Sequence, residues 1–254
     1  MSSTEPSRAN ALEVLGEYRG LVFVDKPAGL QTEPDARHTD TLVHRVAAQL
    51  GVSLERVHAL SRLDTAVSGV VTLGLTSDAR RLVGDWRARG RFRRRYLAIA
   101  SGEITERSGT WSECIGRGSG NLRQVGGRNP DAAQTDFAWV LSTPSFARAN
   151  PKQLHLLALA PKTGRTHQLR VHASAHGLPL LGDRAYGGVA RLTSITGSVR
   201  ELARIALHAA WVELPLDEPR RIEAPVPQAL LEAWRDFSGD HEAFRAASEL
   251  VLGA

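Results

Sequence analysis

The chain has 254 residues, which is long enough for one large domain or for two small lobes that share a core. Its hydrophobic content of 42% and charged content of 23% are typical of a folded globular protein, and its net charge of +5, carried mostly by arginine, favours a polyanionic partner. A single cysteine, Cys114, excludes a disulfide framework and a cysteine-rich zinc site.

The first half of the chain alternates short apolar runs with turn residues. Residues 1–18 are small, polar and mixed in charge, which predicts a flexible N-terminal arm without the apolar core of a signal peptide. No apolar run reaches the ~18 residues that a membrane span requires, so we expect a cytoplasmic protein. The predicted elements are a strand over 21–24, a helix over 42–50 capped near Thr39 or Asp40, a strand over 70–75 and a helix from Ser77 to Gly90.

The second half begins with a basic run over residues 91–95, which is either a solvated face or a set of phosphate contacts. Residues 103–136 are rich in glycine and polar side chains, so we expect strands joined by long exposed loops there, and the main loop is expected over 116–129. Strands that mix with helices without regular alternation predict an α+β fold. Further strands are predicted over 137–141, 154–159 and 205–214, helices over 167–175, 230–237 and 241–252, and a second loop over 189–198.

One carboxylate stands in an unusual setting. Asp64 lies between leucines and an arginine, directly before the apolar run that starts at Val70. An aspartate at such a place usually caps a turn. A catalytic role needs an ionised, partly dry carboxylate, which a nearby guanidinium would hold in its charged form and orient. Arg62 and Arg165 are the candidates, although each could equally be a surface arginine.

Other catalytic patterns are incomplete. His172 and His176 are four residues apart on a predicted helix. The zinc-hydrolase pattern requires a glutamate between the two histidines, and none is present. No third ligand is evident either, so we expect no metal. Ser68 lacks the G-x-S-x-G context of a nucleophilic serine. The chain also lacks a phosphate-binding glycine loop, so we expect no nucleotide cofactor.

Several motifs follow one another in a fixed order along the chain. They are Val24–Leu30, Arg62–Asp64 with Ser68 and Gly69, Arg95–Ala98 with Gly102, Thr163–Gly187, and Leu207–Ala209 with Pro225–Pro227. Through these motifs the chain resembles the RluA-type family of RNA pseudouridine synthases over nearly all of its length beyond the N-terminal arm. The resemblance implies an α+β catalytic fold with a central mixed, largely antiparallel sheet, flanking helices and a central cleft. We therefore expect residues 19–254 to be the catalytic domain, without a separate N-terminal RNA-binding domain.

The resemblance implies a role for individual residues. Asp64 matches the catalytic aspartate that attacks the target uridine covalently, after which the uracil detaches, turns and rejoins the ribose through C5. Tyr96 matches a tyrosine that contacts the base and transfers a proton, and Arg165 matches the basic partner of the aspartate. The expected substrate-binding residues are Arg62 beside the extruded nucleotide, Leu169 against the uracil, Lys162 and His167.

Two positions depart from the family pattern. Ser61 stands where the family usually has histidine, and Val67 where it has threonine, so two polar side chains near the nucleophile are replaced. Because Asp64, Tyr96 and Arg165 remain, we expect a monomeric, cofactor-independent enzyme that converts uridine to pseudouridine in structured ribosomal or transfer RNA. The alternatives are a catalytically silent RNA-binding protein on the same scaffold and, more weakly, a metal hydrolase that uses the histidines.

Overall fold

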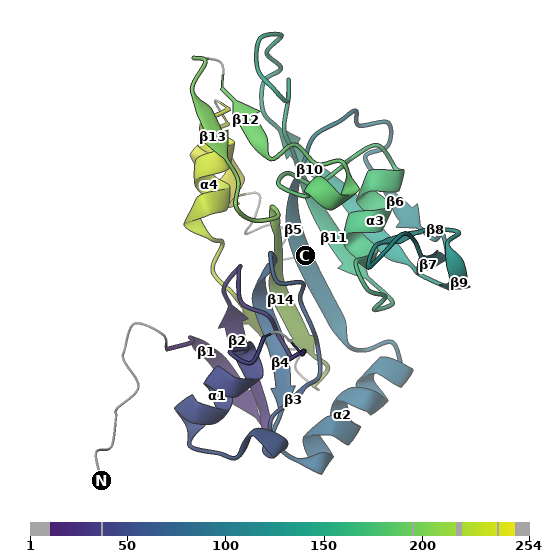
Figure 1. Cartoon of the computed structure of the whole chain (residues 1–254), viewed down its shortest axis with the longest axis vertical. Coiled ribbons are helices and arrows are strands. Elements are labelled where there is room, and N and C mark those ends of the chain that lie inside the picture. Colours follow the sequence, from purple (N-terminus) through teal and green to yellow (C-terminus); the bar gives the residue numbers. More distant parts are fainter. Residues whose placement is uncertain (1–10, 37, 195, 217–219, 238, 247–254) are drawn as a thin grey trace. The chain divides into compact units, whose positions relative to one another are not determined.

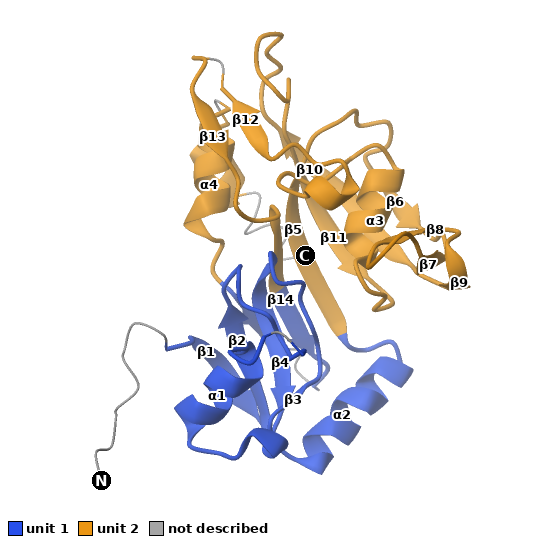
Figure 2. Cartoon of the chain, in the orientation of Figure 1, with its two compact units in different colours: residues 1–92, 211–224 blue, residues 93–210, 225–254 orange. Residues whose placement is uncertain are grey.

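The computed structural model describes residues 11–246 except 37, 195, 217–219 and 238, as Figure 1 shows. The chain forms two compact units, coloured separately in Figure 2. Unit 1 is drawn from Met1–Phe92 and Trp211–Ala224, and unit 2 from Arg93–Ala210 and Pro225–Ala254. Both units combine antiparallel strands with a few helices, which confirms the α+β prediction. Within the described residues, no helix is both long and apolar enough to cross a bilayer.

Unit 1 is built on the antiparallel strand order β1-β2-β4. The short β3 also pairs with β4, and β15 pairs with the part of β14 that belongs to this unit. The predicted strand over 21–24 extends to Lys26, and its four apolar residues are almost fully buried. The elements are β1 (Val14–Tyr18), β2 (Leu21–Lys26), α1 (Leu42–Leu50), the 3-10 turn η2 (Leu54–Arg56), β3 (His58–Ala59), β4 (Ser68–Gly74), α2 (Ser77–Ala88), β14 (Leu207–Leu214) and β15 (Arg220–Glu223).

The core of unit 1 forms where α2 covers the strands. As its periodicity predicts, α2 buries Ala79, Val83 and Trp86, which pack with side chains of β2 and β4. Thr76 caps the helix by accepting a hydrogen bond from the Ala79 amide. The predicted cap of α1 at Thr39 or Asp40 is wrong by one or two residues, because Thr41 is the N-cap and its hydroxyl bonds His44 instead.

Unit 2 is built on the antiparallel order β5-β11-β10-β6. Helix α3 packs against β10 and β11. Two small sheets complete the unit, β8-β7-β9 and the pair β12-β13. The elements are β5 (Arg93–Ala100), β6 (Ser108–Trp111), β7 (Ile115–Arg117), β8 (Arg123–Val125), β9 (Arg128–Asp131), β10 (Thr135–Ser142), β11 (His155–Pro161), α3 (Gln168–Ala175), the turn η3 (Arg184–Tyr186), β12 (Arg191–Thr193), β13 (Val199–Glu201) and α4 (Gln228–Arg235).

Three further sequence predictions need correction. The expected N-terminal arm ends earlier, because Val14–Tyr18 form β1 and pair with β2; residues 1–10 lie outside the described residues. The expected loop over 116–129 contains most of a three-stranded sheet, and the one over 189–198 contains β12. These strands are only three or four residues long, too short for an alternating pattern to register. The second tail helix covers 241–246, and 247–254 lie outside the described residues.

A close backbone approach joins the end of β5 to the turn after α3. Gly102 has φ +135°, and a Cβ atom placed on it would lie 2.0 Å from the carbonyl oxygen of Gly177. Neither the conformation nor the space admits a side chain. Glycine at this position therefore lets the turn after α3 approach the end of β5.

We expect Gly102→Ala to lower the free energy of unfolding by about 2–4 kcal/mol, because the added methyl group meets backbone rather than a movable side chain. Gly84→Ala, in the middle of α2 with no atom within 4 Å of the added Cβ, should instead raise it by up to about 1 kcal/mol. Urea unfolding of both variants gives the comparison. Equal stability of the two variants would contradict the close approach.

Candidate active site

The segment that carries Asp64 connects β3 to β4 and is tied to β4 through Ser61. The amides of Leu60 and Ser61 both donate to the carbonyl oxygen of Thr72, and the Thr72 amide donates to the Ser61 hydroxyl over 2.9 Å. The side chain of Ser61 is buried. The serine that replaces the family's histidine therefore keeps a polar role, since it holds the start of the loop in place.

Thr32 fixes the residue directly before the nucleophile candidate. Its Oγ1 accepts a hydrogen bond from the Leu63 amide over 3.2 Å and donates one to the Leu63 carbonyl oxygen over 2.9 Å. Asp64 follows, half-buried, and its carbonyl oxygen accepts from the Val67 amide over 3.0 Å, which closes a turn. Val67 is buried, so the second departure from the family pattern fills an apolar position.

A buried lysine anchors the same turn from the other side. Lys26 is fully buried, and its Nζ donates to the carbonyl oxygens of Pro27, Leu30 and Thr65. The Gly29 amide adds a further bond to Thr65 O over 2.7 Å. Burial of an ammonium group is costly unless its donors are satisfied, so this lysine holds the two loops together.

Arg62 lies beside Asp64 in sequence but points to solvent. Its side chain is 68% exposed, and its guanidinium contacts Glu33 Oε2 over 3.3 Å. Exposed ion pairs of this kind contribute little stability. Arg62 can therefore exchange Glu33 for another partner at small cost.

The predicted residues of unit 2 other than Tyr96 lie in or next to one turn between β11 and α3, which Gln168 organises. The Gln168 side chain accepts hydrogen bonds from the Thr163 hydroxyl and the Arg165 amide. It donates to the Gln134 carbonyl oxygen and the Thr135 hydroxyl. A buried amide with all of these partners satisfied fixes the turn against β10.

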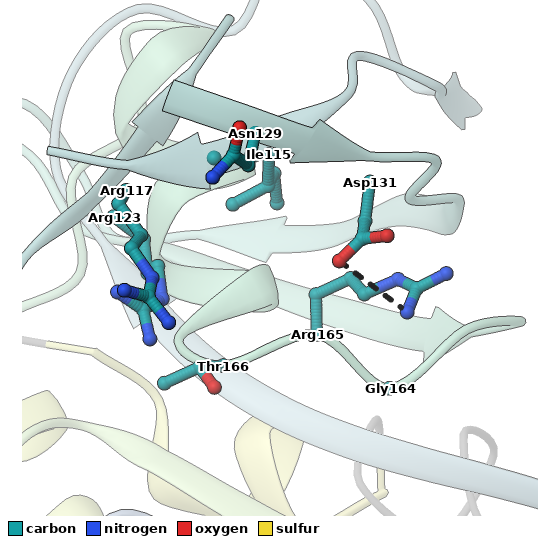
Figure 3. A pocket seen from close by; sticks show the side chains of 9 residues that line it. Ile115, Arg117, Arg123, Asn129, Asp131, Gly164, Arg165 and Thr166 are labelled. Carbon is teal, nitrogen blue, oxygen red and sulfur yellow. Dashed lines mark ion pairs between the residues drawn. The ribbon is translucent and has the colours of Figure 1, made fainter. Parts of the chain in front are cut away.

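Arg165 projects from this turn toward β9. Its Nε donates to the carbonyl oxygen of Ala132 over 2.9 Å, and its Nη1 lies 3.7 Å from an Asp131 carboxylate oxygen. Figure 3 marks this ion pair with Asp131. The side chain is 41% exposed, so the pair with Asp131 is weak. Asp64 belongs to unit 1 and Arg165 to unit 2, and their pairing stays a prediction.

Lys162 contacts a carboxylate in its own unit. Its Nζ lies 2.8 Å from Asp136 Oδ2. Partial burial would raise the pKa of Asp136, but hydrogen bonds from Lys162 and Thr110 outweigh that effect and hold this pKa below its usual value. The role of Lys162 in substrate binding stays a prediction.

His167 is the N-cap of α3 and adopts a left-handed conformation with φ +57°. Its Nδ1 is hydrogen-bonded to the Tyr186 hydroxyl over 2.8 Å, and the Arg123 amide donates to the same hydroxyl over 2.9 Å. The Tyr186 ring in turn lies against the guanidinium of Arg170, which forms a buried bidentate pair with Asp183. Tyr186 therefore links His167 to β8.

Tyr96 and Leu169 are both almost fully buried. Tyr96 lies on β5 opposite Leu159 of β11, and Leu169 lies in the first turn of α3. Their roles toward the base stay predictions. No role was predicted for Lys26, Thr32, Gln168 or Tyr186, although all but Thr32 lie within the motifs that carry the resemblance.

The two histidines of the metal alternative do meet a carboxylate. His176 Nε2 lies 2.9 Å from Glu113 Oε1, while His172 is bonded to Thr135 Oγ1 and to the Glu113 carbonyl oxygen. In the described part of the chain, no group of three or more histidine, cysteine, aspartate or glutamate side chains is arranged to hold a metal ion. The hydrogen bonds of His172 instead join α3 to β10.

Comparison with known proteins identifies the family. Residues 20–175 match the family model described as RNA pseudouridylate synthase. The chain is 32% identical to ribosomal large subunit pseudouridine synthase D of Pseudomonas aeruginosa, over 92% of this chain and 74% of that protein. It is 31% identical to the RNA pseudouridine synthase YhcT of Bacillus subtilis, over 89% and 72%. The solved structure of human RNA pseudouridylate synthase domain containing 1 has a TM-score of 0.67 at 27% identity and covers 89% of each chain.

The protein is therefore a pseudouridine synthase by class. The chain belongs to the RNA pseudouridylate synthase family, which confirms the resemblance drawn from its motifs.

We expect Thr32→Val to lower the free energy of unfolding by about 1–3 kcal/mol, because it leaves the amide and carbonyl of Leu63 without their buried partner. The Leu63 amide should also exchange its hydrogen faster. Thr65→Val, whose side chain is exposed on the same turn, is the matched control and should change neither quantity. Urea unfolding with hydrogen exchange of the Leu63 amide tests this. Protection equal to that of the wild type would contradict it.

Burial holds the pKa of His155 and of His172 below the ordinary 6.5, although the carbonyl oxygens of Gly102 and Glu113 oppose that effect. The unfolded chain then binds more protons below about pH 6.5, so stability should be complete above that pH and fall as pH decreases toward the folded pKa values. Urea unfolding between about pH 7.5 and pH 5.5 should show a loss of about 1 kcal/mol or more. His155→Gln should make the free energy of unfolding depend less steeply on pH. A free energy of unfolding that rises on acidification would contradict the lowered pKa of the two histidines.

Proposed function

We propose that the protein converts uridine to pseudouridine in RNA, with Asp64 as the nucleophile. The observation that carries the proposal is the restrained turn of Asp64. Hydrogen bonds of Ser61, Thr32 and Lys26 hold the segments on either side of Asp64. Catalysis by a positioned group requires such rigidity, because a loosely held carboxylate would lose the orientation that accelerates attack. Family membership supports the reaction class.

In the proposed reaction, the Asp64 carboxylate forms a covalent bond to the target nucleotide while the bond between uracil N1 and the ribose breaks. The uracil turns, and a bond forms between its C5 and the ribose while the bond from Asp64 to the nucleotide breaks. The hydrogen on C5 leaves as a proton, and N1 takes up a proton. Substrate and product are isomers, so no cofactor is consumed. Tyr96 contacts the base and transfers the proton, and Arg165 stabilises the carboxylate.

The remaining proposed contacts hold the nucleotide outside its stack. Arg62 is exposed and easily released from Glu33, which suits a role beside the extruded nucleotide. Leu169 supplies an apolar surface for the uracil, and Lys162 and His167 contact the flanking RNA. In this proposal residues 19–254 act as the catalytic domain.

The proposed substrate is ribosomal RNA, with transfer RNA as the second possibility. A relative that is 32% identical is named for the large ribosomal subunit, which supports the first choice. An enzyme of ribosomal RNA works where ribosomes are made, so we propose a cytoplasmic location. A monomer is the simplest form, since one chain carries every proposed contact.

Ser61 and Val67 are the residues that support a silent RNA-binding scaffold as the alternative. In the folded chain Ser61 accepts a hydrogen bond from Thr72, and Val67 is packed in the interior. Both positions thus stabilise the loop without the polar groups of the family pattern. This arrangement favours the active enzyme over the silent scaffold.

We expect wild-type protein to release tritium from ribosomal RNA labelled at uridine C5, and Asp64→Asn to release it at least about 10³-fold more slowly while binding the RNA equally well. Asp85→Asn, an exposed carboxylate on α2, is the matched control and should behave as the wild type. Tritium release and RNA affinity are measured on the same preparations. Equal release by both variants would remove Asp64 from its role, and no release by wild type from ribosomal or transfer RNA would favour the silent scaffold.

A further inference from the structure

Two arginines lie directly opposite each other on the small sheet of unit 2. Arg117 of β7 and Arg123 of β8 are register partners, and Figure 3 shows their side chains extending from the same side of the sheet toward Thr166. Like charges at such a position repel each other and destabilise the strand pair. In the part of the chain that the structure describes, neither guanidinium forms an ion pair with a carboxylate.

The two arginines line a polar pocket of about 250 Å³ between the small sheet and the turn before α3. Asn129 and the hydroxyl of Thr166 add hydrogen-bonding groups to its wall. The one carboxylate among the lining residues, Asp131, lies on the side of Arg165 and pairs with it. The charges of Arg117 and Arg123 are therefore left without a counter-charge in the pocket.

Contacts with α3 and Tyr186 hold the strands that form one wall of the pocket. Ile115 of β7 packs with Ala133, Val171 and Tyr186, which anchors the small sheet on α3. The Arg123 amide donates to the Tyr186 hydroxyl, so β8 is fixed as well. These contacts hold the backbones of both strands in place. The strand register therefore places the two arginines opposite each other.

The chemistry of the pocket selects an oxyanion. Two guanidinium groups present parallel N–H donors that match the oxygens of a phosphate, and a bound anion would cancel their repulsion. The pocket is open to solvent on the side of Thr166 and has little apolar lining, so it suits a charged group on a longer chain rather than an enclosed small molecule.

We propose that this pocket binds one phosphodiester group of the RNA substrate between Arg117 and Arg123. The inference rests on the proposed function and adds a contact that positions the RNA strand. Arg165 lines the same pocket, so the bound phosphate lies beside the residue proposed to act on the nucleophile. Phosphate contacts of this kind fix the register of a nucleic acid without reading its sequence.

The test compares the full chain carrying Arg117→Gln and Arg123→Gln with a control carrying Arg148→Gln and Arg191→Gln. The control residues are exposed arginines of unit 2 outside the pocket, so both proteins lose the same net charge. Binding of an oligouridylate is measured over a range of salt concentrations. We expect the pocket variant to bind about 10-fold more weakly and its slope of log K against log salt to fall by about 0.7 relative to the control.

Two further ligands distinguish an RNA phosphate from free inorganic phosphate as the anion in the pocket. An oligouridylate with uncharged methylphosphonate links should bind the pocket variant and the control equally, because the phosphate charge is absent. Inorganic phosphate alone should bind the control only weakly. If the two proteins differ in affinity for inorganic phosphate but not for the oligouridylate, the pocket holds a free anion and the proposal is overturned. Equal affinities and equal salt slopes also overturn it.

The free energy of unfolding and the rate of tritium release are measured on the same variants. Removing one of two repelling charges should leave the free energy of unfolding of Arg123→Gln unchanged or higher, whereas a structural role would lower it. If the double variant unfolds, Arg123→Gln alone serves for the binding measurement. In tritium release, we expect the pocket variant to raise KM about 10-fold with kcat unchanged. No release by wild type would overturn the proposed function alone, since the binding comparison does not depend on turnover.

Discussion

The Asp64 turn depends on one buried ammonium group. Lys26 donates to carbonyl oxygens on both sides of the turn, from the loop after β2 and from Thr65, and no water reaches its side chain. An interior donor with three acceptors strongly favours one arrangement of those backbones, because any other would leave polar groups unsatisfied. Thr32 and Ser61 add bonds on the remaining sides. A carboxylate on a turn this restrained loses little entropy when it meets a substrate.

In unit 2, two parts of the proposed site are held by hydrogen bonds between neutral groups. Gln168 fixes the turn that carries Arg165, and Tyr186 connects His167 to the small sheet. The turn that carries Arg165 and the side chain of His167 are thus held by neutral groups. The guanidinium group of Arg165 stays 41% exposed, and the net charge of +5 is in line with an anionic partner.

Some sequence predictions were confirmed because their signals are local. The stripe of α2, the apolar run of β2 and the glycine at the end of α1 each follow from residues within a few positions of one another. The strands β1, β7 and β12 were missed for the opposite reason. They are short and partly exposed, and they exist because a partner strand satisfies their backbone groups.

The sequence by itself determined the α+β class and, through its ordered motifs, the family to which the chain belongs. Only the tertiary structure showed that Ser61 keeps a hydrogen bond, that Asp131 and Asp136 lie beside Arg165 and Lys162, and that Arg117 stands opposite Arg123. These facts join residues far apart in the chain or depend on strand register. Pairing across strands is set by the packing of the whole unit, so no local pattern records it.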